Sequence, residues 1–190
     1  LTLYEKRVDS ADLPFFIEVM QVLAESGLNC PLPVTARDGS ILQELQGRPC
    51  AIFTFLDGTW SRFPNREKCA ELGRTLATMH LNCAPVKLRR PNALGPAAWE
   101  PLLDSIGRQA DIVGDGMHDA IRQRLDSILA AWPTDLPSGV IHADLFPNNV
   151  LFIGDDLTGV IDFYFACDDI LAYDLGICLN SWCFEPDGSF

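Results

Sequence analysis

The stretch VIHADLFPNNVLFIGDDLTGVIDFYFACDD, residues 140–169, decides the fold of this chain. Three short apolar runs are separated in it by polar and turn-forming residues, a pattern typical of strands joined by loops. Asp144 follows the first run, Asn149 directly precedes the second, and Asp162 lies at the end of the third. If the second and third runs pair through the turn at 154–156, we expect the ends bearing Asn149 and Asp162 to lie side by side.

These polar residues have the chemistry of a phosphoryl-transfer site. The side-chain oxygens of Asn149 and Asp162 suit Mg²⁺, a hard cation that takes few carboxylates and completes its shell with phosphate oxygens. Asp144 is left free of the metal, so it can orient an attacking hydroxyl and accept its proton. A base, metal ligands and a rigid frame are the parts that such a site requires. The competing interpretation is that these residues only form turns, which their spacing in this strand context disfavours.

The same residues carry a resemblance to a known family. HADLFPNN, at 142–149, matches the H-x-D-x-x-x-x-N catalytic loop of the kinase-like small-molecule phosphotransferases, and IDF, at 161–163, matches their metal-binding D-F-G segment. LGRTLATMH, at 72–80, resembles the first large-lobe helix of the aminoglycoside phosphotransferase and choline kinase group, and FTFLDG, at 53–58, resembles their hinge. Within this superfamily, four segments are similar to the homoserine kinases: LTLYEKR, CPLPV, GVIHADLFPNNVLF and IDFYFACDDILAYDLGICLNSWCFE.

The resemblance implies an α+β, two-lobed protein-kinase-like fold that is incomplete at both ends. Residues 1–58 would form a partial N-terminal nucleotide-binding lobe with a hinge near 53–58. Residues 59–190 would form a truncated, helical C-terminal lobe that carries the catalytic loop and the metal site. The phosphate-covering hairpin of the superfamily has no counterpart here, so we expect weakened nucleotide binding.

Local patterns predict the individual elements. Helices are predicted where apolar residues recur at helical spacing, at 10–26, 65–80, 97–109, 118–132 and 170–184. Strands are predicted at 1–8, at ILQEL (41–45) after a hairpin turn in ARDGS (36–40), through GRPCAIFTFLDG (47–58), and at VIHA, VLFIG and LTGVIDF.

The resemblance also implies roles for the catalytic-loop residues. Asp144 corresponds to the catalytic base, and His142, the other catalytic residue of the motif, is expected to brace the loop and not to transfer protons. Asp174, in AYDLG, matches a helix acid that supports this loop in related enzymes. His80 is expected to be a packed structural residue, and His118 an exposed one.

ATP and Mg²⁺ are the cofactors that the resemblance implies. Asn149 and Asp162 correspond to the Mg²⁺ ligands, and the backbone of Thr54, Phe55 and Leu56 would face the adenine.

One position departs from the superfamily pattern. A strand Lys usually holds the α- and β-phosphates, and Thr2 stands at the aligned position. Lys6 points to the same strand face but lies about 13 Å further along the strand. Glu18 is a candidate for the helix partner of such a lysine.

The homoserine kinase resemblance implies ATP-dependent phosphorylation of the homoserine hydroxyl, in threonine biosynthesis. An amino-acid substrate needs an acid for its ammonium group, and Asp168 and Asp169 are the candidates. Arg89 and Arg90 either meet the substrate carboxylate or are solvated. Three alternatives stay open: an aminoglycoside- or choline-type kinase, a non-catalytic kinase-like nucleotide-binding protein, and a metal-dependent hydrolase.

Composition narrows the partners and the compartment. With 14 basic against 26 acidic residues, the net charge of −12 disfavours nucleic acid and anionic membranes. The seven cysteines show no C-x-x-C spacing, which indicates free thiols in a reducing compartment. No apolar run reaches the roughly 18 to 20 residues of a membrane span. We therefore expect a cytoplasmic protein that acts on a small amino alcohol; its oligomeric state is not predicted.

Overall fold

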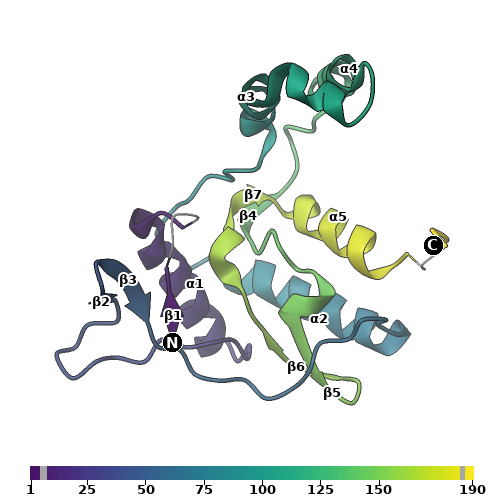
Figure 1. Ribbon diagram of the computed structural model, residues 1–190. Coiled ribbons are helices and arrows are strands. Elements are labelled where there is room, and N and C mark those ends of the chain that lie inside the picture. Colours follow the sequence, from purple (N-terminus) through teal and green to yellow (C-terminus); the bar gives the residue numbers. More distant parts are fainter. Residues whose placement is uncertain (5–7, 185–186) are drawn as a thin grey trace. The chain divides into compact units, whose positions relative to one another are not determined.

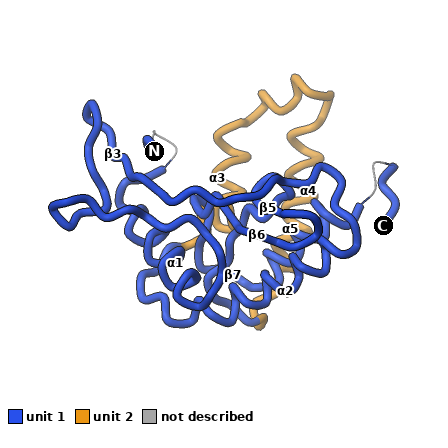
Figure 2. Tube along the Cα trace, turned by 90° about the horizontal axis from the view of Figure 1, so that it is seen from below, with its two compact units in different colours: residues 1–90, 137–190 blue, residues 91–136 orange. Residues whose placement is uncertain are grey.

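The computed structural model describes residues 1–4, 8–184 and 187–190, so the predicted strand at 1–8 is described only in part. The chain forms two compact units, one of residues 1–90 with 137–190 and the other of residues 91–136 (Figure 2). This division is not the predicted lobe boundary near residue 58, which stays a prediction. We describe each unit by itself.

The first unit opens with a three-stranded antiparallel sheet in the order β1-β3-β2, made of β1 (Thr2–Leu3), β2 (Gln43–Leu45) and β3 (Arg48–Ala51) (Figure 1). The β2–β3 hairpin turns at Gln46 and Gly47, both with positive φ (53° and 73°), as a tight two-residue hairpin requires.

Two strand predictions in this region need correction. ARDGS does form a turn, in which Ala36 N–H donates to the Ser40 carbonyl (2.8 Å), and β2 lies within the strand predicted after it, but no strand pair flanks the turn. The strand predicted through 47–58 ends at Ala51, and an isolated bridge between Pro33 and Phe53 follows. Beyond Ala51 the chain is an extended connection and not a ladder.

Helix α1 (Leu13–Glu25) follows a short 3₁₀ turn, η1 (Ser10–Asp12), which confirms the predicted helix. The Asp9 carboxylate accepts Ala11 N–H at 2.9 Å, so it caps the turn as its position predicts. One face of α1 supplies much of the core of this unit, with these residues buried: Leu13, Phe15, Phe16, Ile17, Val19, Met20 and Leu23.

Helix α2 (Arg66–Asn82) is confirmed with its predicted cap. Asn65 Oδ1 accepts Lys68 N–H at 2.9 Å, and Leu72, Leu76 and Met79 form the buried stripe. Strands β4 (Ser138–Ile141) and β6 (Asp156–Val160) pack against α2, which brings the quoted stretch onto this helix (Figure 1).

The quoted stretch forms two antiparallel pairs. Strands β5 (Val150–Ile153) and β6 (Asp156–Val160) make the predicted hairpin, and β4 (Ser138–Ile141) pairs with β7 (Cys167–Ile170). The 3₁₀ turn η3 (Pro147–Asn149) ends the loop between β4 and β5, and a second 3₁₀ turn, η4 (Phe163–Phe165), follows the hairpin. The pattern did not predict β7, because CDDI has no alternation and its partner strand lies some 30 residues earlier in the chain. Helix α5 (Leu171–Trp182) follows, as predicted.

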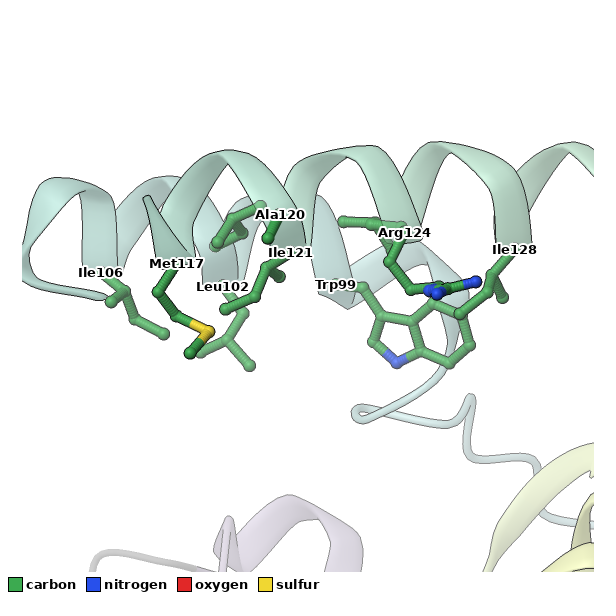
Figure 3. A pocket seen from close by; sticks show the side chains of 10 residues that line it. Trp99, Leu102, Ile106, Met117, Ala120, Ile121, Arg124 and Ile128 are labelled. Carbon is green, nitrogen blue, oxygen red and sulfur yellow. The ribbon is translucent and has the colours of Figure 1, made fainter. Parts of the chain in front are cut away.

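The second unit contains α3 (Pro96–Ile106), the 3₁₀ segment η2 (Gly107–Ile112) and α4 (Met117–Ala130), close to the predicted helices. Its buried apolar residues are Leu103, Ala110 and Leu125. A groove of about 620 Å³ runs along α3 and α4, and Figure 3 shows Trp99 and Arg124 among its lining residues. None of the helices described in the two units is long and apolar enough to cross a membrane.

Candidate active site

The loop that follows β4 is held by one buried carboxylate. Asp174, fully buried in α5, accepts His142 N–H on Oδ2 and Ala143 N–H on Oδ1, both at 2.8 Å. Ala143 has φ of 62°, a left-handed conformation that is strained for a residue with a Cβ. The two bonds to Asp174 hold this strained peptide in place. The geometry agrees with the supporting role predicted for Asp174.

A second residue completes this network. His80 Nε2 lies 3.0 Å from Asp174 Oδ2, and the histidine is nearly buried near the end of α2. Because a carboxylate only accepts, the ring nitrogen donates this bond. The prediction for His80 was a packed residue, and it missed this bond to the acid that holds the loop. The available signal was a polar residue at the end of the apolar stripe of α2.

His142 uses both of its ring nitrogens inside the protein. Nε2 lies 3.0 Å from the Ile161 carbonyl and must donate to it, so Nδ1 is left to accept Asp144 N–H at 3.3 Å. The ring is fully buried and contacts Phe163, with centroids 4.7 Å apart. Burial lowers the pKa of His142, which favours this neutral form. No ring nitrogen is left for a substrate, and the geometry agrees with a bracing role.

Asp144 is half-buried and held from one side. Asn149 Nδ2 donates both to the Asp144 carbonyl (2.7 Å) and to its Oδ2 (2.8 Å). Oδ1 of Asp144 has no hydrogen-bond partner among the described residues. Burial raises the pKa of the Asp144 carboxyl, which makes it a better proton acceptor than an ordinary aspartate. One oxygen is fixed, and the other is available to a hydroxyl.

Asn149 and Asp162 lie at adjacent ends of the hairpin, as the spacing predicts. Val150 pairs with Val160, and Ile161 N–H donates to the Asn149 carbonyl at 2.9 Å. Nδ2 of Asn149 is bonded to Asp144, so a cation would be held through Oδ1, which here accepts Asn148 Nδ2–H at 3.3 Å.

The Asp162 side chain is exposed, and it has no partner in the part of the chain that the structure describes. Its backbone, at φ 66° and ψ 60°, is left-handed. An amide oxygen and a carboxylate are hard oxygen donors that fit Mg²⁺, which leaves its other positions to phosphate and water. The donors present here therefore fit the metal that the resemblance implies.

A cavity of about 230 Å³ lies between the hairpin end that carries Asp162 and the segment predicted to be the hinge. It is lined by Thr2, Met20, Pro31, Phe53, Thr54, Asp162, Phe163 and Tyr164. Thr54 N–H donates to the Leu32 carbonyl and Thr54 Oγ1 accepts Leu32 N–H, each at 2.9 Å. The Thr54 N–H is therefore bonded within the protein, and contact of Thr54, Phe55 and Leu56 with an adenine stays a prediction. Phe55 itself is 92% exposed.

The superfamily's phosphate-holding lysine has three related candidate residues here, and the structure describes only two of them, Thr2 and Glu18. Thr2 lines the cavity with Asp162, and Lys6 lies outside the described residues. The two carboxylate oxygens of Glu18 accept the backbone N–H groups of Lys87 and Leu88, both at 2.9 Å. Glu18 thus holds the chain after α2, and its pairing with a lysine stays a prediction.

Asp168 and Asp169, the predicted substrate acids, line a separate cavity of about 410 Å³ near Arg89. Asp168 accepts Arg90 N–H (2.9 Å) and an Arg89 guanidinium N–H (3.1 Å), so it holds the 89–90 backbone. Strand register puts Asp169 opposite Gly139, before β4 reaches the catalytic loop. Their role toward a substrate stays a prediction.

The arginines are placed differently. The Arg90 Nε atom donates to Asp12 at 2.6 Å, and an Arg90 guanidinium N–H donates to the Ala166 carbonyl at 3.1 Å. Arg89 is largely exposed. The Arg90 side chain therefore joins Asp12 to the Ala166 backbone, a structural role that neither of its two predicted roles anticipated.

Known proteins resemble this chain in sequence and in fold. The model of the phosphotransferase enzyme family (APH) matches residues 1–190. The homoserine kinase of Rhizobium etli is 56% identical over 190 residues, which are 100% of this chain and 59% of that protein. The homoserine kinase of Bradyrhizobium diazoefficiens is 58% identical over 191 residues, or 58% of its length. The chain thus spans less than two thirds of these relatives.

Solved structures with low sequence identity share the fold. An amicoumacin kinase solved with AMP-PNP and Ca²⁺ has a TM-score of 0.73 at 16% identity, over 92% of this chain and 54% of that one. An aminoglycoside-3'-phosphotransferase of type VIII has a TM-score of 0.67 at 19% identity, over 95% and 68%. These likenesses confirm the predicted α+β, kinase-like fold. The family model, which matches the whole chain, shows that it belongs to the phosphotransferase enzyme family.

Proposed function

We propose that this protein transfers the γ-phosphoryl group of ATP to the hydroxyl of homoserine, with Mg²⁺ as cofactor. The observation that carries the reaction class is the convergence of Asp144, Asn149 and Asp162 at one end of a hairpin. The substrate is inferred from relatives named homoserine kinase that are 55–58% identical along the whole chain. The free thiols of all seven cysteines support a cytoplasmic location.

Each residue of the site then has one task. Oδ1 of Asp144 accepts the hydroxyl proton while the hydroxyl oxygen forms its bond to phosphorus and the bond to the ADP leaving group breaks. Asn149 holds the other Asp144 oxygen through Nδ2, and it would hold Mg²⁺ through Oδ1 together with Asp162. Bound Mg²⁺ would neutralise charge on the phosphate oxygens. Asp174 and His142 fix the loop so that Asp144 does not have to reorient.

The proposal is tested by measuring ADP release with homoserine, choline and kanamycin as acceptors, on the protein at the full length of its relatives. Turnover with homoserine alone is expected. Asp144→Asn keeps the shape of the side chain and removes the base, so turnover should fall by at least about 100-fold. Binding of Mg²⁺ and nucleotide should stay near that of the wild type. Turnover of choline or kanamycin in place of homoserine would reassign the substrate.

A non-catalytic nucleotide-binding protein is the second candidate. The observation that favours it is Thr2, which lines the cavity at the position where the superfamily places its lysine. Nucleotide binding by calorimetry, without turnover of any of the three acceptors, would support this candidate over the kinase.

A further inference from the structure

Two tyrosine hydroxyls meet close to Asp162. The hydroxyl oxygens of Tyr4 and Tyr164 are 3.2 Å apart, and the rings meet edge to face with centroids 5.4 Å apart at 81°. Phe16 of α1 makes a second edge-to-face contact with Tyr164, at 5.6 Å and 89°. Tyr4 directly follows β1, so these contacts join the small sheet, α1 and the segment after Asp162.

Asp162 depends on its chain neighbours for its position. Its own carboxylate has no bonding partner within the described ranges, and its left-handed backbone is unfavourable for a residue with a Cβ. On its N-terminal side, Ile161 is bonded through N–H to Asn149 (2.9 Å) and through its carbonyl to His142 (3.0 Å). On its C-terminal side, the Phe163 ring contacts His142, and Tyr164 meets Tyr4.

We propose that Tyr164 is a positioning residue for the metal ligand Asp162, and that the Tyr4 hydroxyl holds Tyr164 in place. Thr2 and Tyr4 are two residues apart, so they share one face of the extended chain. Thr2 lines the same cavity as Asp162 and Tyr164. The bond between the Tyr4 and Tyr164 hydroxyls therefore fixes the distance between Thr2, on the β1 side of this cavity, and Asp162.

The surroundings of Tyr4 and Tyr164 favour a stable contact between the two hydroxyls. Tyr4 is 5% exposed, and burial raises its pKa well above the ordinary value for tyrosine, so the hydroxyl keeps its proton at physiological pH. Edge-to-face packing on both sides of Tyr164 restricts its ring as well. The inference rests on the proposed function only through Mg²⁺ and nucleotide, and not through homoserine.

Tyr164→Phe and Tyr4→Phe each keep the ring and remove one of the two hydroxyls. Calorimetry with a non-hydrolysable ATP analogue measures affinity in Mg²⁺ and, separately, in EDTA. Each variant should bind about two- to twelvefold more weakly in Mg²⁺, the range expected for one lost hydrogen bond, and within twofold of wild type in EDTA. The double variant should be no weaker than either single variant, because both remove the same bond.

Ser26→Ala is the matched control, since it also removes one hydroxyl bond in this unit, to the Leu23 carbonyl (2.7 Å) at the end of α1. It should bind nucleotide as the wild type does in both buffers. Hydrogen exchange of residues 161–166 gives a readout independent of nucleotide, and it should accelerate in Tyr4→Phe but not in Ser26→Ala.

Three results would overturn the inference: unchanged affinity in Mg²⁺, an equal loss in EDTA, or unchanged exchange of 161–166 in Tyr4→Phe. If the chain binds no nucleotide in either buffer, the exchange measurement decides alone. A protein that shows the expected Mg²⁺ dependence but leaves homoserine unphosphorylated would refute the proposed function and leave this inference standing.

Discussion

The two compact units bury their apolar residues to different degrees. In the first unit a continuous core joins α1, α2, the β5–β6 hairpin and α5, and it encloses the polar residues His142 and Asp174. The second unit buries few side chains and leaves Ile112 and Val113 more than 80% exposed. The candidate active site lies in the unit whose core fixes polar groups by hydrogen bonds. Accurate placement of reactive groups depends on such packed support.

Removal of the Asp174 carboxylate should have the largest effect on the first unit. Asp174→Ala leaves the buried N–H of His142 and the partly buried N–H of Ala143 without acceptors and His80 without its partner. We expect the free energy of unfolding to fall by about 3–5 kcal/mol, measured by urea denaturation. Asp115→Ala, at an exposed position of the second unit, should change it by less than about 0.5 kcal/mol. A loss below about 1 kcal/mol for Asp174→Ala would mean that other groups satisfy these amides.

Equal truncations in the two units should differ in cost. Leu72 of α2 is 3% exposed within the core, and Leu125 of α4 is 8% exposed beside an open groove. Leu72→Ala should cost about 2–5 kcal/mol, and Leu125→Ala less than about 2 kcal/mol, because less packing is lost there. Hydrogen exchange resolved by peptide measures the opening free energy of α2 and α4 separately. Equal costs would show that the second unit is as well packed as the first.

Glycine positions give a smaller contrast inside the first unit. Gly58 has φ of 132°, and a Cβ there would overlap Thr158 Oγ1 and approach the Phe152 carbonyl at 3.1 Å. Gly58→Ala should lower the free energy of unfolding by about 1–3 kcal/mol. Gly73→Ala, in open space on α2, should raise it by about 0.5–1 kcal/mol. Thermal unfolding measures both, and a loss at Gly73 would contradict the open environment of that residue.

The pH dependence of stability should show the smallest effect. Burial lowers the pKa of His142 in the folded state, so the unfolded chain binds this proton more readily. The stabilisation is therefore complete above the unfolded pKa of about 6.5 and is lost as pH falls toward the lowered folded value. His142→Gln should flatten the decline in unfolding free energy below pH 6.5, measured by urea denaturation at several pH values. If the unfolding free energy falls with the same slope in the wild type and in His142→Gln, another titrating group causes the decline.

The sequence was informative where structure is local. The hairpin that joins Asn149 and Asp162 was predictable because its two strands adjoin in sequence and their apolar pattern sets the register. Helices α1 and α2 were predictable for a similar reason, since Asp9 caps the 3₁₀ turn before α1 and Asn65 caps α2, each within one turn.

Contacts between distant residues were not predictable from local patterns. The bond between His80 and Asp174 spans 94 residues, and β7 is a strand because β4 supplies its partner. The tight turn at Gln46 was also missed, because glutamine carries no signal for positive φ. Each of these features depends on tertiary packing, which overrides the weak preference of the local sequence.

The extended connection after β3 is bonded to the β5–β6 hairpin along its edge. Thr59 and Phe152 exchange backbone bonds at 2.9 and 3.0 Å, and Thr158 Oγ1 donates to the Asp57 carbonyl at 2.7 Å. These bonds thus hold the segment expected to contact the adenine rigidly against the hairpin whose ends carry Asn149 and Asp162. Under the proposed function, these bonds fix the distance between the sites for the adenine and for the terminal phosphate. A nucleotide lengthened by one phosphate should therefore be a poor donor, because the site cannot stretch to match it.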